Sequence, residues 1–134
     1  MPKRFYVSSR KDRSEQANAL SEALKAQGWE RTFVWTDQSR GGPEARAATA
    51  EAELKGVRDA DILVVLLPGG FGTHVEIGAA LALGKKILLH SPDQKTLETP
   101  YPCVFHYHPR VKLIVSGTLE VSQVMALIEE FPDR

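Results

Sequence analysis

An uninterrupted apolar run, residues 62–67, constrains the fold of this chain more than any other feature. The run shows no alternation of polar and apolar residues, which is typical of a strand covered on both faces in a parallel sheet. A glycine-rich turn (residues 68–72) follows directly, and then an Ala- and Leu-rich segment that ends at Gly84. A strand, a glycine-rich turn and a helix in this order predict a ligand-binding turn at the carboxyl end of a parallel strand.

Strand and helix signals alternate along the rest of the chain. Strands are predicted at residues 5–7, 32–36, 62–67, 86–90 and 111–115. Four helices are predicted: one at 14–27, one that begins at Pro43, one that follows the glycine-rich turn and ends at Gly84, and one at 119–131. In the helix after Pro43, Ala47, Ala50, Leu54 and Val57 recur at spacings of three and four, so we expect this stripe to face the sheet. The alternation predicts one α/β domain over residues 1–134, with a doubly wound, mostly parallel five-stranded sheet of flavodoxin or Rossmann-like type.

Length and composition exclude several classes of protein. The 134 residues suffice for one domain with a hydrophobic core. Lys+Arg 17 balances Asp+Glu 17, which argues against a nucleic-acid polymer or an anionic membrane as partner. The single cysteine, Cys103, cannot form an internal disulfide, and no apolar stretch suits a signal peptide or a membrane span. We therefore expect a cytoplasmic protein.

Doubly wound sheets bind ligands outside the carboxyl ends of their strands. In this chain that edge is predicted to contain residues 8–10, Asp37, residues 69–76, Ser91 and Ser116. A carboxylate such as Glu76 suits a sugar that acquires positive charge better than it suits a phosphate.

The first of these segments, Ser8, Ser9 and Arg10, offers hydroxyls and a guanidinium for a 5'-phosphate. A solvated turn with a helix cap is the alternative for the same residues.

Thr73 and Glu76 also have the spacing of a capping box, in which the two side chains close the start of a helix. A cap does not need the three glycines that precede it, whereas a turn that admits a substrate does. The two roles are compatible, because a helix N-terminus is expected to lower the pKa of the Glu76 carboxyl and keep it ionised.

Three segments resemble the nucleoside 2-deoxyribosyltransferase family, which includes the 2'-deoxynucleoside 5'-monophosphate N-glycosidases. They are Phe-Tyr-Val-Ser-Ser at residues 5–9, the Ala-Asp pair at 60–61, and the glycine- and alanine-rich motif at 72–85. The resemblance implies that Glu76 is the nucleophile, that Tyr6 bonds near its carboxylate, and that Glu53 lies near sugar and base. It also implies a homodimer or higher homo-oligomer. Without the resemblance, the sequence favours a core aromatic residue at Tyr6 and an exposed helix residue at Glu53.

Position 70 departs from that family. Its transferases usually carry an aspartate six residues before the nucleophile, where it helps to protonate the leaving base, and this chain has Gly70. The turn itself resembles the PGGxGTxxE motif of the cytokinin-activating phosphoribohydrolases, which hydrolyse the same bond in nucleoside 5'-monophosphates. That resemblance implies that Gly69, Gly70, Gly72 and Thr73 lie against ribose or phosphate.

Other chemically capable residues give weaker signals. His106 and His108 would lie on one face of an extended segment, as a metal pair requires, but the sequence offers no evident third ligand. Cys103 reads as a small buried residue and His74 as a surface histidine at a helix start. We therefore predict no metal site.

The sequence thus predicts an enzyme that cleaves or transfers the N-glycosidic bond of a (deoxy)nucleoside or its 5'-monophosphate, without a metal or redox cofactor. Trp35 and Phe71 are candidates to flank a flat base, or to pack in the core. A non-catalytic nucleotide-binding domain is the main alternative, favoured by Gly70. A redox flavoprotein is a third possibility for such a sheet.

Overall fold

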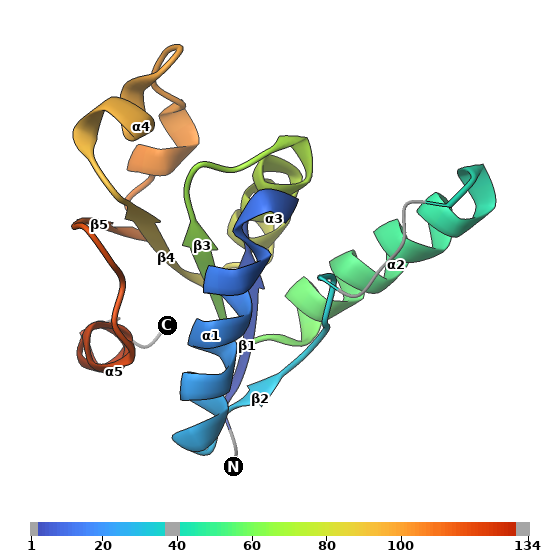
Figure 1. The fold of residues 1–134 in the computed structure, drawn as a ribbon, viewed down its shortest axis with the longest axis horizontal. Coiled ribbons are helices and arrows are strands. Elements are labelled where there is room, and N and C mark those ends of the chain that lie inside the picture. Colours follow the sequence, from blue (N-terminus) through green and yellow to red (C-terminus); the bar gives the residue numbers. More distant parts are fainter. Residues whose placement is uncertain (1–2, 37–40, 131–134) are drawn as a thin grey trace.

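The computed structural model describes residues 3–36 and 41–130. Its parallel sheet has the strand order β2-β1-β3-β4-β5 (Figure 1). The strands are β1 (Arg4–Ser8), β2 (Glu30–Arg31), β3 (Ile62–Leu66), β4 (Lys86–Ser91) and β5 (Val111–Val115). This is the flavodoxin-like order, so the predicted α/β class is confirmed.

Helices cover both faces of the sheet, because α1 contacts α5 while α2 contacts α3. Their bounds are α1 (Ser14–Ala26), α2 (Pro43–Asp59), α3 (Phe71–Ala82), α4 (Gln94–Glu98) and α5 (Val121–Ile128), with short 3₁₀ helices η1 (Lys11–Arg13) and η2 (Val104–Tyr107). The predicted end of the last helix, residue 131, lies outside the described part of the chain. Among the described helices, none combines the length and the apolar character that crossing a bilayer requires.

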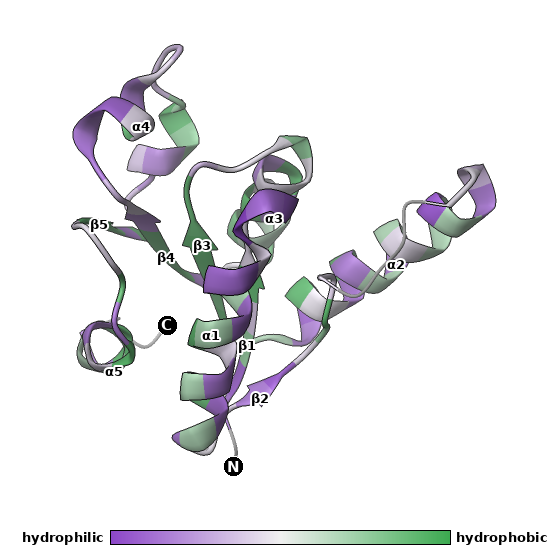
Figure 2. Cartoon of the chain, in the orientation of Figure 1, coloured by the Kyte–Doolittle hydropathy of each residue, from purple (hydrophilic) through white to green (hydrophobic). Residues whose placement is uncertain are grey.

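The core follows from the apolar run with which the sequence analysis began. Every residue of β3 is buried, and so are the last four residues of β1 and the last five of β4. The hydropathy colouring shows β3 in green along its length, as an apolar strand (Figure 2). A strand that is covered on both faces keeps both of its rows of side chains from water, which explains the absence of alternation.

The second strand is shorter than predicted and lies earlier in the chain. Residues 32–36 were expected to form it, but β2 comprises only Glu30–Arg31. The N–H of Thr32 still donates to the carbonyl of Phe5 at 3.0 Å. Further along, the indole N–H of Trp35 donates to the carbonyl of Val7 at 2.5 Å. The pairing between β1 and β2 ends there because the indole of Trp35 bonds to the carbonyl of Val7, which the backbone of a longer β2 would otherwise use.

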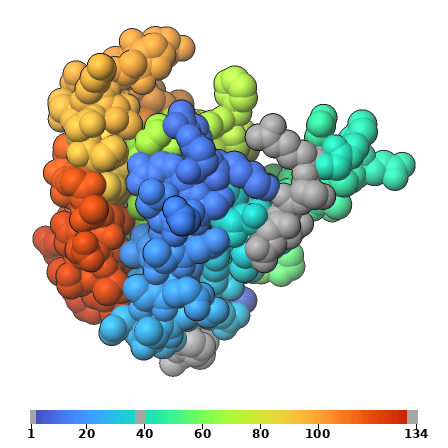
Figure 3. Space-filling model, viewed as in Figure 1, coloured from blue at the N-terminus to red at the C-terminus, as the bar shows by residue number. Residues whose placement is uncertain are grey.

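The prediction that α2 lays an apolar stripe on the sheet is wrong for most of the helix. Of the four stripe residues only Val57 is buried, whereas Ala47, Ala50 and Leu54 are exposed. The helix runs outward past the edge of the sheet, and its first turns project from the body (Figures 1 and 3). A two-residue edge strand offers no sheet surface for these turns to cover.

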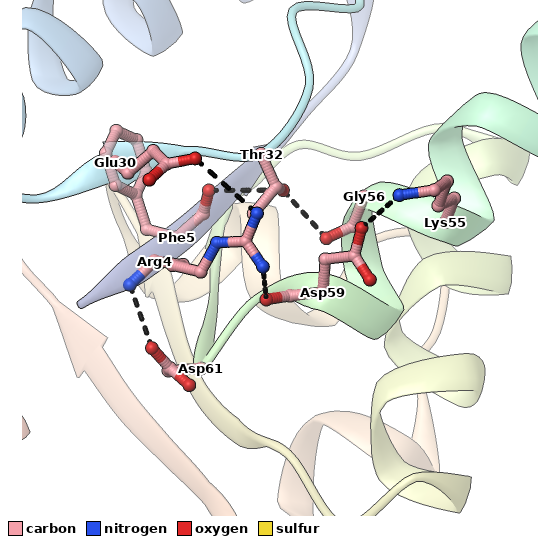
Figure 4. Close-up of polar contacts among 8 residues, drawn as sticks. All are labelled: Arg4, Phe5, Glu30, Thr32, Lys55, Gly56, Asp59 and Asp61. Carbon is pink, nitrogen blue, oxygen red and sulfur yellow. Dashed lines mark hydrogen bonds and ion pairs between the residues drawn. The ribbon is translucent and has the colours of Figure 1, made fainter. Parts of the chain in front are cut away.

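The carboxyl end of α2 is fixed to the edge of the sheet by polar contacts (Figure 4). The guanidinium of Arg4 donates to the carbonyl of Asp59 at 3.3 Å, and its backbone N–H donates to the Asp61 carboxylate at 2.9 Å. The hydroxyl of Thr32 donates to the carbonyl of Gly56 at 2.7 Å. These bonds set the position of the helix turn that carries Glu53.

Candidate active site

Glu76 lies in a cavity of about 420 Å³ at the carboxyl edge of the sheet. Its side chain is only 5% exposed. The hydroxyl of Tyr6 donates to Oε2 at 2.6 Å, and the hydroxyl of Ser8 donates to Oε1 at 2.5 Å. Both donors come from β1, and the acceptor comes from α3, beyond the neighbouring strand β3. The carboxyl group is therefore held by one hydroxyl on each oxygen.

The cavity brings together most of the residues that the sequence singled out. Its lining is Ser9, Arg10, Lys11, Asp12, Trp35, Glu53, Gly70, Gly72, Thr73 and Glu76. Lys11 and Asp12 were not predicted, because nothing distinguishes them in sequence from an ordinary solvated turn.

Tyr6 is fully buried and its hydroxyl touches both acidic residues, with Oε1 of Glu53 at 3.3 Å. Burial, and then the charges and hydrogen bonds of Glu76 and Glu53, raise the pKa of Tyr6 far above its ordinary value. The phenol therefore stays protonated and acts as a donor. A Cβ at Gly56 would lie 2.9 Å from the Tyr6 ring, so this glycine lets α2 approach the ring. A glycine within an Ala-rich helix was the signal that sequence reasoning missed.

The prediction of a lowered Glu76 pKa is wrong. The pKa of Glu76 is raised from 4.5 to about 8, chiefly by burial and then by hydrogen bonding and charge from Glu53, while the bonds from Ser8 and Tyr6 oppose the shift. Glu76 is the sixth residue of α3, and the effect of a helix terminus fades beyond the first turn. Desolvation therefore outweighs the helix dipole.

The predicted capping box between Thr73 and Glu76 does not form. The helix begins at Phe71, and the N–H of Gly70 donates to Oγ1 of Thr73 at 3.2 Å. Glu76 is committed to Tyr6 and Ser8 instead. The start of the helix is thus closed without the acidic residue, which leaves Glu76 for the cavity.

The glycines of the turn have different physical roles. A Cβ at Gly69 would lie 2.6 Å from the methyl group of Thr73, so this position needs glycine for the turn to close on the helix. A Cβ at Gly70 would make an ordinary contact with Arg10 at 3.6 Å. A Cβ at Gly72 would meet no described atom within 4 Å, and Gly72 lines the cavity. Gly70 also lines the cavity, so at both positions the lack of a side chain leaves room for a ligand, most clearly at Gly72.

The three residues predicted to hold a phosphate separate into different roles. Ser8 is used to hold Glu76, and the hydroxyl of Ser9 donates to the carbonyl of Arg10 at 3.0 Å. The exposed guanidinium of Arg10 donates twice to Asp12, at 3.1 and 2.9 Å. Arg10 therefore supplies a cation at the cavity, with Asp12 as its present partner.

Other predicted residues lie in or away from the cavity. Trp35 is buried and lines it, so packing and contact with a ligand are compatible there. Phe71 is 97% exposed and does not line it. Ser91 and Ser116 each donate to a carbonyl two residues further on. Asp37 lies outside the described residues.

The histidines are arranged differently from the predicted pair. His106 lies in η2 rather than in an extended segment, and Nδ1 of His108 accepts the N–H of Arg110. The ring of His106 stacks instead on His74, with centroids 5.1 Å apart, and their Nε2 atoms are 3.0 Å apart. Burial, and then the charge of His74, lower the pKa of His106. The side chain of Cys103, partly buried rather than buried as predicted, lies beside this pair.

Comparison with known proteins places the chain in a family. The sequence model of the nucleoside 2-deoxyribosyltransferase family matches residues 5–129. No curated protein sequence matches the chain.

Solved structures share the fold. A CMP N-glycosidase from Clostridium botulinum aligns with a TM-score of 0.66 at 20% identity, covering 95% of this chain and 99% of its own. A 2-deoxyribosyltransferase from Leishmania mexicana aligns with a TM-score of 0.62 at 18% identity, covering 98% of this chain and 100% of its own. A 2-deoxyribosyltransferase from Bacillus psychrosaccharolyticus aligns with a TM-score of 0.55 at 27% identity, covering 66% of this chain and 72% of its own.

Proposed function

The chain belongs to the nucleoside 2-deoxyribosyltransferase family, and we propose that it breaks the N-glycosidic bond of a (deoxy)nucleoside 5'-monophosphate with Glu76 as the nucleophile. One observation carries this proposal: a buried carboxyl group is held by Tyr6 and Ser8 within an open cavity. Desolvation and a fixed orientation are what a carboxylate needs to meet an anomeric carbon.

In the proposed reaction, the ionised carboxylate of Glu76 forms a bond to the anomeric carbon of the sugar. The bond from that carbon to the base breaks, and its electron pair leaves with the base, which takes up a proton from solvent. Water then attacks the anomeric carbon of the glycosyl ester and loses a proton to solvent, which releases the sugar and regenerates the carboxylate. Tyr6 and Ser8 orient the attacking group, and Glu53 lies beside them at the cavity to contact the sugar.

Hydrolysis is the version of this chemistry that Gly70 favours. The cavity wall at this position carries no side chain that could donate a proton to a base or hold a second base for transfer. Water needs no such recognition. Transfer to an added base is the alternative, and it is distinguished by the product formed.

A 5'-phosphate in the substrate is supported by the other end of the cavity. The first N–H groups of an α-helix have no acceptor within the helix, and Gly72 and Thr73 of the first turn of α3 line the cavity together with Arg10. An anionic group bound there would displace Asp12 from the guanidinium. A phosphate is a suitable replacement because it accepts two parallel hydrogen bonds from arginine.

The test is to incubate the protein with matched nucleosides and 5'-monophosphates, ribo- and deoxy-, and to quantify free base by chromatography. Release of base from a monophosphate is expected, with no new nucleoside when a second base is added. Glu76→Gln keeps the size of the side chain and is expected to abolish release. Equal release by wild type and this variant would overturn the assignment.

A second candidate is a nucleotide-binding domain without catalysis. The raised pKa of Glu76, about 8, favours it, because a protonated carboxyl is a poor nucleophile at neutral pH. A monophosphate that raises the melting temperature, without base release at any pH up to 9, would favour this candidate over the enzyme.

We also propose that the protein is a homo-oligomer. Phe71 and Val75, one turn apart on α3, are 97% and 61% exposed, and Leu54 on the contacting helix α2 is 42% exposed. Large apolar side chains that are exposed on neighbouring helices are typical of an interface. The protruding first turns of α2 add a further surface that a second copy would cover.

A further inference from the structure

We propose that His74, Cys103 and His106 form a binding site for a zinc ion, outside the cavity that contains Glu76. The ligand atoms of these three side chains, two imidazole nitrogens and one sulfur, lie within 4.8 Å of one another. Among the described residues, this is the group of histidine, cysteine and acidic side chains with the spacing of a metal site. Imidazole and thiolate are the ligands that zinc prefers in proteins.

The distances suit a tetrahedral ion after a small adjustment. Zinc bonds of about 2.0 Å to nitrogen and 2.3 Å to sulfur place ligand atoms roughly 3.3 to 3.8 Å apart. The two Nε2 atoms are 3.0 Å apart, slightly closer than two nitrogens bound to one ion, so the rings need to separate by a few tenths of an ångström. The thiol of Cys103 lies within 4.8 Å of both nitrogens, so it needs to approach by at most roughly 1 Å to reach bonding distance of a shared ion.

The hydrogen bonding of His74 also fits a ligand. Its Nδ1 lies 2.8 Å from the carbonyl of Gly70, an oxygen that can only accept, so Nδ1 carries the proton. The lone pair is then on Nε2 and points toward His106. A ligating histidine whose other nitrogen donates to a backbone carbonyl is the common arrangement around zinc, because it fixes the tautomer and the ring orientation. In the metal-free protein the Nε2 of His106 donates to the Nε2 of His74. Because Nδ1 of His106 has no partner among the described groups, the proton can move to Nδ1 when an ion takes the place of this hydrogen bond.

The local backbone explains why Cys103 and His106 face the same point. Cys103 precedes the 3₁₀ helix η2, and His106 is three residues later. Side chains at this spacing eclipse one another in a 3₁₀ helix, so a Cys-x-x-His pair presents both groups to one side. The third ligand comes from the first turn of α3, some thirty positions earlier. An ion bound here would tie the segment between β4 and β5 to the helix that carries Glu76.

The first experiment uses the full chain, without a polyhistidine tag and treated with a chelator, titrated with Zn²⁺ by calorimetry. Binding of one equivalent and a rise of several degrees in melting temperature are expected. Cys103→Ser, His74→Gln and His106→Gln should each weaken binding by at least tenfold and abolish the thermal shift. His108→Asn, which keeps an acceptor for the N–H of Arg110, is the matched control and should bind as the wild type does.

A second experiment reports directly on the ligands. Co²⁺ in place of zinc should give the strong visible bands of a tetrahedral site and a sulfur-to-cobalt charge-transfer band that Cys103→Ser removes. The proposal is overturned if the wild type binds no Zn²⁺, if the serine variant keeps the charge-transfer band, or if His108→Asn weakens binding as much as His74→Gln. In those cases the two rings form only a histidine–histidine hydrogen bond. None of these readouts depends on base release, so they are independent of the function proposed for Glu76.

Discussion

The hydroxyl of Ser8 donates to Oε1 of Glu76 across 68 positions of the chain, at 2.5 Å, and both side chains are almost completely buried. Ser8 ends β1 and thereby fixes a carboxyl group on α3, the helix that follows the neighbouring strand β3. The bond opposes the effect of burial on the Glu76 pKa but does not cancel it. The balance between burial and hydrogen bonding at this carboxyl determines the behaviour expected below.

The rate of base release should depend on pH through Glu76. With a pKa of about 8, its carboxyl is mostly protonated at pH 7, so kcat/KM should rise about tenfold per pH unit below that value and level off above it. Initial rates between pH 5.5 and 9.5 measure this. A profile that is flat from pH 6 upward would show that Glu76 ionises with an ordinary pKa or does not act as nucleophile.

Two variants should move that profile in opposite directions. Glu53→Gln removes a group that raises the pKa of Glu76, so the midpoint should shift to lower pH. Tyr6→Phe removes a hydrogen bond that lowers the pKa, so the midpoint should shift to higher pH, with a lower maximal rate as orientation is lost. The same midpoint in both variants would contradict the assignment of the titrating group. Melting temperatures of both proteins serve as the folding control.

Glu76→Gln should stabilise the protein at high pH while abolishing turnover. The folded-state pKa is raised from 4.5 to about 8, so the wild type should lose stability as pH rises through this range and change little from this cause above it. Each unit of pKa difference between the folded and unfolded protein corresponds to roughly 1.4 kcal/mol, so the loss of stability is at most a few kcal/mol. Urea unfolding at pH 5 and pH 9 should show that the variant gains relative to wild type only at pH 9. A constant difference between the two pH values would refute the burial argument.

Gly69 and Gly72 form a matched pair for substitution by alanine. Gly69→Ala places a methyl group 2.6 Å from Thr73 and should lower the free energy of unfolding by about 1–3 kcal/mol. Gly72→Ala meets no described atom and should leave stability equal or slightly higher, since alanine favours the helix. Its KM should nevertheless rise, because the new methyl group enters the cavity. An unchanged KM would mean that the substrate does not approach this part of the turn.

Phe71→Asp tests the proposed oligomer. The side chain is 97% exposed and does not line the cavity, so the subunit should fold unchanged while an apolar interface would be broken. Size-exclusion chromatography with light scattering measures the mass. Lys112→Ala, a substitution on β5 away from α2 and α3, serves as the control. A wild type that is monomeric at all accessible concentrations would refute the oligomer directly.

The sequence was sufficient for the α/β class and for the central strand because these depend on patterns along the chain. A continuous apolar run reports burial on both faces, and a glycine-rich turn reports where a strand gives way to a helix. The same reasoning failed at residues 32–36. Their β-branched and aromatic side chains suit a strand, but the indole of Trp35 occupies the backbone acceptor of Val7. Propensity does not register this competition, because it depends on a contact between distant residues.

At the site, the sequence by itself determined that Glu76 follows a glycine-rich turn, and resemblance to a family brought Tyr6 and Glu53 to attention. Only the tertiary structure decided the charge state expected of that carboxyl, since its pKa reflects burial and three partners from distant parts of the chain. It also decided that His106 meets His74 and Cys103 rather than His108. The pattern along the chain identified the fully buried strand, whereas desolvation and the convergence of ligands arise only when distant segments pack together.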